Sequence, residues 1–203
     1  MPRHKGDHDA RRRDVSAAVW RVLAAHGFGG LTMRAVAAEM GATTGLLTHY
    51  FPSKKDLLGH ALALLEERRA TRPRRTPQEG LEGFSALRAA LVDILPLTPE
   101  AAADNRIWVS SWDAALADPE LAAGHAARYA RSRERLGLLV RAAQARGELA
   151  PADPDELAAD IQSFSLGLIV QVLLGGADAY PPERQIRLLD GYLARLTPAR
   201  AIE

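Results

Sequence analysis

The chain has 203 residues, is 47% hydrophobic and contains no cysteine. It is long enough for one large or two small domains, and the missing cysteines exclude disulfides and thiolate metal sites. The net charge of +1 is the sum of a basic N-terminal part and an acidic remainder. Residues 1–75 carry 14 Lys and Arg against 7 Asp and Glu, whereas residues 76–203 carry 12 against 18. A basic first third predicts a polyanionic partner, with a solvated basic surface as the alternative.

No apolar run approaches the roughly 18 residues that a membrane-spanning helix needs. The charged start of the chain also lacks the apolar segment of a secretory signal. We therefore expect a soluble, cytoplasmic protein with no membrane contact. The sequence contains no Cys-x-x-Cys site, no phosphate loop and no nucleophile elbow, so we expect no metal, no cofactor and no catalysis.

Residue usage and periodicity predict an all-α fold of about nine helices. In the first third, an apolar face from Val15 to Leu23 predicts a helix that ends at Gly27. The ranges expected next are 32–40, 44–50 and 53–72, capped by Thr32, Thr43 and Ser53.

Proline positions predict the later helices, because a capping residue before a proline marks a helix start. Thr76-Pro77, Thr98-Pro99, Asp118-Pro119 and Asp153-Pro154 all have this form. Together with Pro181-Pro182, these starts predict helices over 79–95, 99–117, 119–146, 154–175 and 182–196.

The second and third helices form a distinctive pair. They are short, and a turn containing Gly41 joins them, with the longer first helix as support. This arrangement predicts a helix-turn-helix whose second member enters the DNA major groove. The alternative is an ordinary helical hairpin without DNA function.

A family resemblance agrees with this reading. The run Gly-Phe-Gly-Gly-Leu-Thr-Met-Arg-Ala-Val-Ala at 27–37, followed by Gly-Ala-Thr-Thr-Gly-Leu-Leu-Thr-His-Tyr-Phe-Pro-Ser-Lys-Lys-Asp-Leu-Leu at 41–58, resembles the TetR family of repressors. The segment 87–196 is similar to the C-terminal domain of the BetI-type branch. Thr48 stands where many family members have tyrosine, and Ala42 replaces a commoner valine. The resemblance implies a DNA-binding domain over 1–52 and an effector-binding and dimerisation domain over 53–203, connected by helix 53–72.

The candidate DNA-binding residues lie around the predicted recognition helix. They are Thr32, Arg34, Thr43, Thr44, Gly45, Thr48, His49, Tyr50, Lys54 and Lys55. Two lysines at a helix N-terminus oppose the helix dipole, and a phosphate would account for them. The alternative is two solvated lysines. Arg34 fits either a guanine contact or a phosphate contact.

The resemblance also implies a small-molecule effector, choline-like in some relatives. Aromatic rings beside a carboxylate suit a cation, and Trp108 and Trp112 are spaced to share one helix face. The candidate ligand residues are Asn105, Trp108, Trp112, Asp113, Tyr129, Asp160, Phe164 and Gln171, with Gln162 as a further polar candidate. The alternative is that the tryptophans pack in a core or an interface.

The last two helices carry dense apolar faces, which predict a two-fold dimer interface. The candidate contacts are Leu168, Val172, Leu189 and Leu193. The sequence as a whole therefore predicts a homodimeric repressor that binds double-stranded operator DNA and leaves it when an effector binds. The competing hypothesis is a small-molecule sensor without DNA function.

Overall fold

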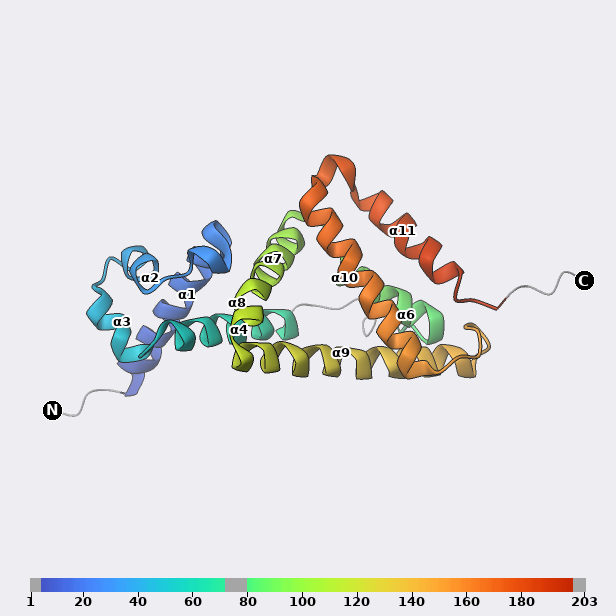
Figure 1. Cartoon of the computed structure of the whole chain (residues 1–203), viewed down its shortest axis with the longest axis horizontal. Helices are drawn as coiled ribbons and strands as arrows, with labels where there is room; N and C mark the ends of the chain where they lie inside the picture. Colours follow the sequence, from blue (N-terminus) through green and yellow to red (C-terminus); the bar gives the residue numbers. More distant parts are fainter. Residues whose placement is uncertain (1–4, 72–79, 199–203) are drawn as a thin grey trace, which may run out of the picture. The chain divides into compact units, whose positions relative to one another are not determined.

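The computed structural model describes residues 5–71 and 80–198, and within these ranges it contains helices, turns and coil but no strand (Figure 1). The all-α prediction is therefore confirmed. The predicted Thr76-Pro77 cap lies outside the described residues, and the helix predicted over 79–95 is shorter, running from Gly83 to Val92.

The chain divides into two compact units. The first, which we call the head, comprises Met1–Arg72 and Arg106–Leu121. The second, which we call the body, comprises Pro73–Asn105 and Ala122–Glu203. These units do not follow the predicted boundary at residue 52, because helix 53–72 and the segment 106–121 both group with the helix-turn-helix.

The N-terminal helices of the head agree closely with the sequence prediction. They are α1 (Lys5–Gly30), α2 (Met33–Glu39), α3 (Thr44–Tyr50) and α4 (Lys54–Thr71). The regular part of α1 ends at Gly27, the predicted terminus, where the backbone turns to φ 62° and ψ −169°. Glycine is required there because this conformation is essentially closed to other residues.

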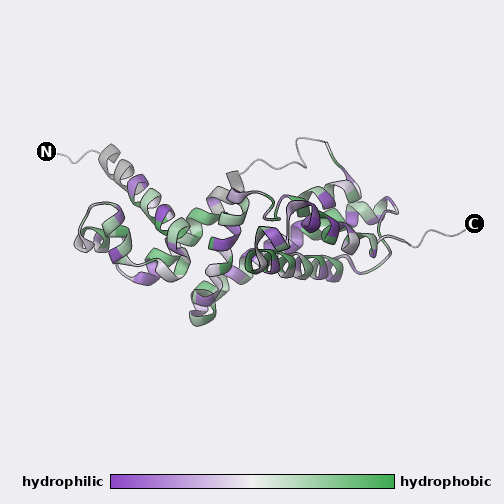
Figure 2. Cartoon of the chain, turned by 90° about the horizontal axis from the view of Figure 1, so that it is seen from above, coloured by the Kyte–Doolittle hydropathy of each residue, from purple (hydrophilic) through white to green (hydrophobic). Residues whose placement is uncertain are grey.

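The core of the head lies where α1 packs on α2 and α4, and where α2 packs on α3. The predicted apolar face of α1 is buried throughout: Val15, Ala18, Val19, Val22 and Leu23 are at most 3% exposed. Leu47 anchors α3 with no exposed surface, and Leu57 does the same for α4. Hydrophobic and hydrophilic residues are interspersed along these helices (Figure 2), and the hydrophobic ones named above are buried.

The body contains α6 (Gly83–Val92), α10 (Pro154–Ala179) and α11 (Pro182–Ala194), and α11 packs on both of the others. Two more helices, α7 (Pro99–Ser110) and α9 (Pro119–Ala145), have residues in both units. The predicted starts at 99, 119, 154 and 182 are confirmed. α10 departs from helical geometry at Gly176, next to the predicted end at 175.

The predicted single helix 99–117 is wrong, because the structure has α7 and then α8 (Trp112–Ala117). The chain tightens at Ser111: its backbone N–H donates to the Trp108 carbonyl at 3.1 Å, and its hydroxyl donates to the same oxygen at 2.6 Å. These i to i−3 bonds replace the i to i−4 bond of a continuing α-helix. The two tryptophans therefore lie on different helices.

The predicted dimer contacts need a correction. Leu189 and Leu193 have no exposed surface, and Leu168 and Val172 are only 5% and 6% exposed. Their side chains belong to the core of the body, so they have almost no surface to offer a second subunit. The apolar faces of α10 and α11 are wide enough to supply this core, and Leu174 and Leu188 remain exposed.

Helix α10 is the one helix among the described residues that is long and apolar enough to cross a membrane by composition alone. It is also a core helix of the body, since 44% of its most apolar window is buried. Leu157, Ile161 and Ile169 are among its buried residues. Packing within the body therefore accounts for its apolar character.

Candidate nucleic-acid interface

The turn between α2 and α3 sets the geometry of the candidate interface. Thr32 caps α2, and its Oγ1 accepts a hydrogen bond from the backbone N–H of Ala35 at 3.1 Å. At the other end, Gly41 adopts φ 62° and the N–H of Ala42 donates to the Ala37 carbonyl at 2.9 Å. A glycine with positive φ at this point is the usual way to end a helix and reverse the chain. The predicted helix-turn-helix is therefore present.

Helix α3 exposes small polar residues. Thr43 occupies the N-cap position in extended conformation, but its side chain makes no capping hydrogen bond. Thr44, Gly45 and Thr48 are all exposed. The Thr48 hydroxyl donates to the Gly45 carbonyl at 2.9 Å. Because Leu47 fixes the opposite side of α3, this polar face is held outward.

Two aromatic residues end α3. His49 is exposed and meets the ring of Tyr50 edge to face, with ring centroids 5.6 Å apart. Tyr50 is half-buried, and Phe51 is buried with its ring 5.1 Å from that of His60. Phe51 therefore anchors the end of the recognition helix, and His49 remains at the surface beside it.

A reciprocal cap begins α4. The Asp56 carboxylate accepts hydrogen bonds from the Ser53 backbone N–H at 3.0 Å and from the Ser53 hydroxyl at 2.7 Å. The Ser53 hydroxyl in turn accepts from the Asp56 N–H at 3.2 Å. The sequence predicted Ser53 in this role but not Asp56. This cap fixes the first turn of α4, which carries Lys54 and Lys55.

The two lysines differ in their surroundings. Lys54 is exposed and makes no ion pair among the described residues. The Lys55 ammonium lies 2.5 Å from a Glu120 carboxylate oxygen and 3.5 Å from one of Asp118. The hydrogen bond that the Lys55 ammonium donates to Glu120 raises the pKa of Lys55 above its ordinary value. Neither carboxylate was singled out as a partner from the sequence, since nothing local links them to residue 55.

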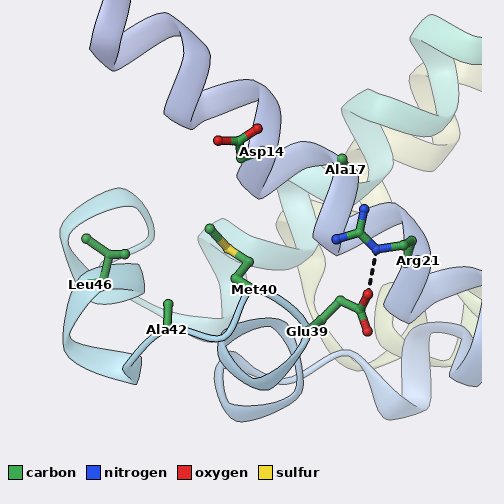
Figure 3. A pocket seen from close by; sticks show the side chains of 7 residues that line it. All are labelled: Asp14, Ala17, Arg21, Glu39, Met40, Ala42 and Leu46. Atoms are coloured by element: carbon green, nitrogen blue, oxygen red, sulfur yellow. Dashed lines mark hydrogen bonds and ion pairs between the residues drawn. The ribbon is translucent and has the colours of Figure 1, made fainter.

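Arg34 is exposed on α2, so its side chain is accessible to a partner. Arg21 on α1 instead pairs with Glu39 at 2.5 Å, beside a surface hollow of about 440 Å³ between α1 and the α2–α3 turn (Figure 3). The hollow is lined by Asp14, Ala17, Arg21, Glu39, Met40, Ala42 and Leu46. None of these is a candidate ligand residue, and we assign the hollow no role.

The candidate ligand residues divide between the units. Trp108, Trp112 and Asp113 belong to the head, whereas Asn105, Tyr129, Asp160, Phe164 and Gln171 belong to the body, with Gln162. Trp108 is buried, Trp112 is half-buried and Asp113 is exposed.

Five of the body candidates have partners within the body: Asn105, Tyr129, Gln162, Phe164 and Gln171. Phe164 stacks on Tyr192 with ring centroids 3.9 Å apart, and Gln171 accepts a hydrogen bond from the Tyr180 hydroxyl at 3.0 Å. The Asn105 amide donates to the Ile94 and Ala101 carbonyls, and the Gln162 amide donates to the Tyr129 carbonyl. These residues support the packing of the body, and their predicted ligand role stays a prediction.

Comparison with known families finds two matches. Residues 16–61 match the family described as "Bacterial regulatory proteins, tetR family". Residues 85–198 match the one described as "BetI-type transcriptional repressor, C-terminal". The two segments together cover most of the chain and include the helix-turn-helix.

Characterised relatives point the same way. The chain is 29% identical over 102 residues to the HTH-type transcriptional regulator PksA of Bacillus subtilis, and 28% identical over 123 residues to BetI of Stenotrophomonas maltophilia. These matches cover 50% and 60% of this chain. They span only half the length of PksA and 62% of that of BetI.

Solved structures share the fold. A transcriptional regulator from Rhodococcus sp. RHA1 superposes with a TM-score of 0.77 at 23% identity, covering 91% of this chain and 94% of its own. A regulator from Saccharomonospora viridis, solved in complex with choline, superposes with a TM-score of 0.74 at 24% identity, covering 92% and 96%.

Proposed function

Because the chain belongs to the TetR family of bacterial transcriptional regulators, we propose that it is a cytoplasmic repressor that binds a pseudo-palindromic operator as a homodimer and leaves the DNA when a small cationic effector binds. Its family and relatives are regulators of transcription, not enzymes. One observation carries the DNA-binding part of the proposal: α3 holds a small polar face outward from a buried Leu47 anchor.

Each candidate DNA residue has a role that its position supports. Thr44, Gly45 and Thr48 are small enough for α3 to approach base edges in the major groove. Thr32, Thr43, His49 and Tyr50 flank that face and contact phosphates, which fix the register of a protein on DNA without reading its sequence. Lys54 is an exposed cation beside them and adds a further phosphate contact.

A homodimer gives the operator its symmetry, because two identical recognition helices read two half-sites. The exposed leucines of α10 and α11 support a subunit contact on these helices: Leu174 is 84% exposed and Leu188 is 40% exposed. A two-fold contact buries the same patch on both subunits. These two leucines replace the buried ones that the sequence suggested.

Two observations support a class of effector. The relative from Saccharomonospora viridis binds choline. In this chain Trp112, on α8, is half-buried and is followed directly by the exposed carboxylate of Asp113. An indole face beside a carboxylate suits a quaternary ammonium group. The proposed effector is therefore a small organic cation, with choline as its first probe.

Selection of bound duplexes from a random DNA pool tests the DNA-binding proposal. We expect enrichment of a pseudo-palindrome, with the protein sedimenting as a dimer. Lys54→Ala should weaken all duplexes similarly and reduce the salt slope by about one per subunit. Arg133→Ala removes the same charge from an exposed position of the body and serves as the control. If no duplex is selected, the chain is a sensor without DNA function.

Arg34→Ala separates the two roles open to that side chain. If Arg34 pairs with a guanine, its loss should relax specificity at one operator position and cost about 1–3 kcal/mol of binding free energy. If Arg34 contacts a phosphate, all sequences should weaken equally. Selection on the variant protein distinguishes the two.

The effector proposal needs a matched pair of probes. Choline should raise the unfolding temperature of the protein and release it from its operator, because a ligand shifts an equilibrium only through unequal affinity for the two states. Its neutral carbon isostere, 3,3-dimethyl-1-butanol, should do neither. Trp112→Ala should weaken choline binding and leave DNA affinity without ligand near normal. If choline and 3,3-dimethyl-1-butanol had equal effects, the proposal that the effector is a cation would be wrong.

A further inference from the structure

The segment Arg106–Leu121 comprises the end of α7, all of α8 and the start of α9. It groups with α1–α4 in one compact unit, although α7 and α9 both have residues in the body as well. Two polar contacts join this segment to the helix-turn-helix region. Each of them involves a part of the head that positions or carries the candidate DNA-binding residues.

The first contact lies at the end of α1. The Phe28 backbone N–H donates to the Ser110 hydroxyl at 3.2 Å, and that hydroxyl donates onward to the Ile107 carbonyl at 2.8 Å. A Cβ atom added at Gly27 would lie 3.2 Å from the same hydroxyl oxygen, so the backbone approaches it closely. The end of α7 is thereby fixed against the connection between α1 and α2.

The second contact lies at the start of α4, where Lys55 pairs with Glu120 and Asp118. Asp118 is itself held in place as the cap of α9, accepting hydrogen bonds from the N–H groups of Glu120 at 2.8 Å and Leu121 at 3.1 Å. The Leu121 N–H contributes most to a lowered pKa for Asp118, which keeps this carboxyl ionised. Two anionic groups thus face Lys55 at neutral pH.

The ion pair of Lys55 lies where it can affect DNA binding. Lys55 stands in the first turn of α4, directly after Lys54, and the Ser53 cap fixes that turn. Both ammonium groups are exposed cations at the end of the helix-turn-helix. Exposed ion pairs in water are weak and easily screened. A DNA phosphate is therefore able to displace Glu120, but it must compete with the carboxylates to do so.

We propose that Glu120 and Asp118 form an autoinhibitory contact that competes with the DNA backbone for Lys55. While Lys55 pairs with the carboxylates, the head has one fewer phosphate contact, and when DNA binds, Lys55 exchanges the carboxylates for a phosphate. The start of α9 thereby sets the DNA affinity, and any rearrangement of α9 that presents these carboxylates differently changes it. This inference rests on the proposed function, since it requires DNA binding.

Removal of the competitor gives the sharpest test. Glu120→Gln keeps the shape of the side chain and removes its charge, so the variant should bind a fixed duplex about two- to fivefold more tightly at low salt. Because Lys55 meets a phosphate in both complexes, the salt slope should change by less than one per subunit, and the gain in affinity should shrink as added salt screens the wild-type ion pair. Glu183→Gln is the matched control, because Glu183 also follows a proline at a helix start and is exposed, but it lies on α11 in the body.

A double-mutant cycle shows whether the gain passes through Lys55. In a Lys55→Ala background, Glu120→Gln should produce no more gain than Glu183→Gln does. If Glu120→Gln lowers or leaves unchanged the affinity of a protein that binds DNA, the pair does not compete with DNA and the inference is wrong. A wild-type chain that binds no duplex would instead overturn the proposed function, and with it this inference.

A measurement without DNA tests the pairing itself. Competitive acetylation with peptide mass spectrometry should find Lys55 less reactive than Lys54 in the free protein. Glu120→Gln should bring the reactivity of Lys55 up to that of Lys54, and Glu183→Gln should leave both unchanged. Equal reactivity of the two lysines in the wild-type protein would overturn the inference.

Discussion

The head and the body stabilise their helix ends in different ways. In the head, the caps come from neighbours in sequence: Thr32 accepts from the N–H of Ala35, and Ser53 exchanges hydrogen bonds with Asp56. In the body, the first turn of α6 is capped from far away, because the Glu148 carboxylate accepts from the Phe84 N–H at 2.7 Å across 64 residues of sequence. The body also has local caps, since Thr98 accepts from the N–H of Ala101 and Asp153 from those of Asp155 and Glu156. The difference is the distant cap that the body adds at α6.

Side-chain hydrogen bonds inside the body also join residues that are far apart in sequence. The buried Gln185 amide donates to the Pro96 carbonyl at 3.3 Å, 89 residues away, and to the Tyr180 carbonyl at 2.9 Å. Arg88 donates twice to Asp190, at 2.6 and 2.8 Å, across 102 residues. These groups of the body therefore find their partners only once its helices are assembled, whereas the caps of α2 and α4 in the head each form within one short stretch of sequence.

The largest effect should come from the core of the body. Leu189→Ala removes a side chain with no exposed surface at the contact of α11 with α6 and α10. We expect a loss of about 2–5 kcal/mol in the free energy of unfolding, because a cavity forms and apolar burial is lost. Urea denaturation followed by circular dichroism measures it.

The control for that variant is Leu116→Ala in the head. Leu116 is 89% exposed, so its truncation should change the unfolding free energy by less than about 0.5 kcal/mol. If Leu189→Ala behaved like Leu116→Ala, the side chain of Leu189 would not belong to the core. The sequence-based choice of Leu189 as a subunit contact would then deserve a second test.

The next effect should come from the backbone of the head. Gly27→Ala places a side chain where φ is 62° and ψ is −169°, and we expect a cost of about 1–3 kcal/mol in unfolding free energy. Gly29→Ala is the matched control, because a Cβ atom there meets nothing within 4 Å. Thermal unfolding should show a lower midpoint for the first variant and little change for the second. Similar midpoints would mean that the turn at Gly27 relaxes.

This contrast explains how much of the fold the sequence predicted. Helix starts at Thr32, Thr98 and Asp153 were predicted correctly because a cap is a pattern of a few adjacent residues. The break at Ser111 was missed, since its bonds to Trp108 occur in a segment with an unbroken helical pattern. The burial of the dimer candidates was also missed, because an apolar face does not reveal whether its partner lies in the same chain.

The sequence also predicted only part of the candidate functional site. The exposed face of α3 was predicted from its small polar residues, and the structure holds Thr44 and Thr48 outward. The pairing of Lys55 with Glu120 was not, because it joins positions 65 residues apart through tertiary packing. For the ligand residues, helical spacing suggested a shared face for Trp108 and Trp112, and the break between α7 and α8 removed that argument.

A local cap should have a moderate effect that is confined to the head. Asp56→Ala removes the carboxylate that accepts from Ser53, and we expect a loss of about 1 kcal/mol in unfolding free energy, the typical worth of a capping interaction. Amide hydrogen exchange should locate the change in the first turn of α4. Protection lost equally in α6 or α11 would contradict a purely local role for this cap.

The Glu148 cap of α6 should make the stability of the protein depend on pH. Hydrogen bonding from the Phe84 N–H, followed by that from Arg146, lowers the pKa of Glu148 below its ordinary value of 4.5. Because the folded protein favours the carboxylate, its stabilisation is fully present above pH 4.5 and is lost as the pH falls through the lowered folded value. Glu148→Gln should therefore be less stable than the wild type at pH 7, and the difference should shrink on acidification below about pH 4. Urea midpoints measured from pH 7 to pH 3 test this. Glu183→Gln removes an exposed carboxylate on α11 that has no hydrogen bond to a distant backbone group in the described part of the chain. Its midpoints should stay at a constant distance from those of the wild type, and if those of Glu148→Gln did so too, Glu148 would not cap α6 in solution.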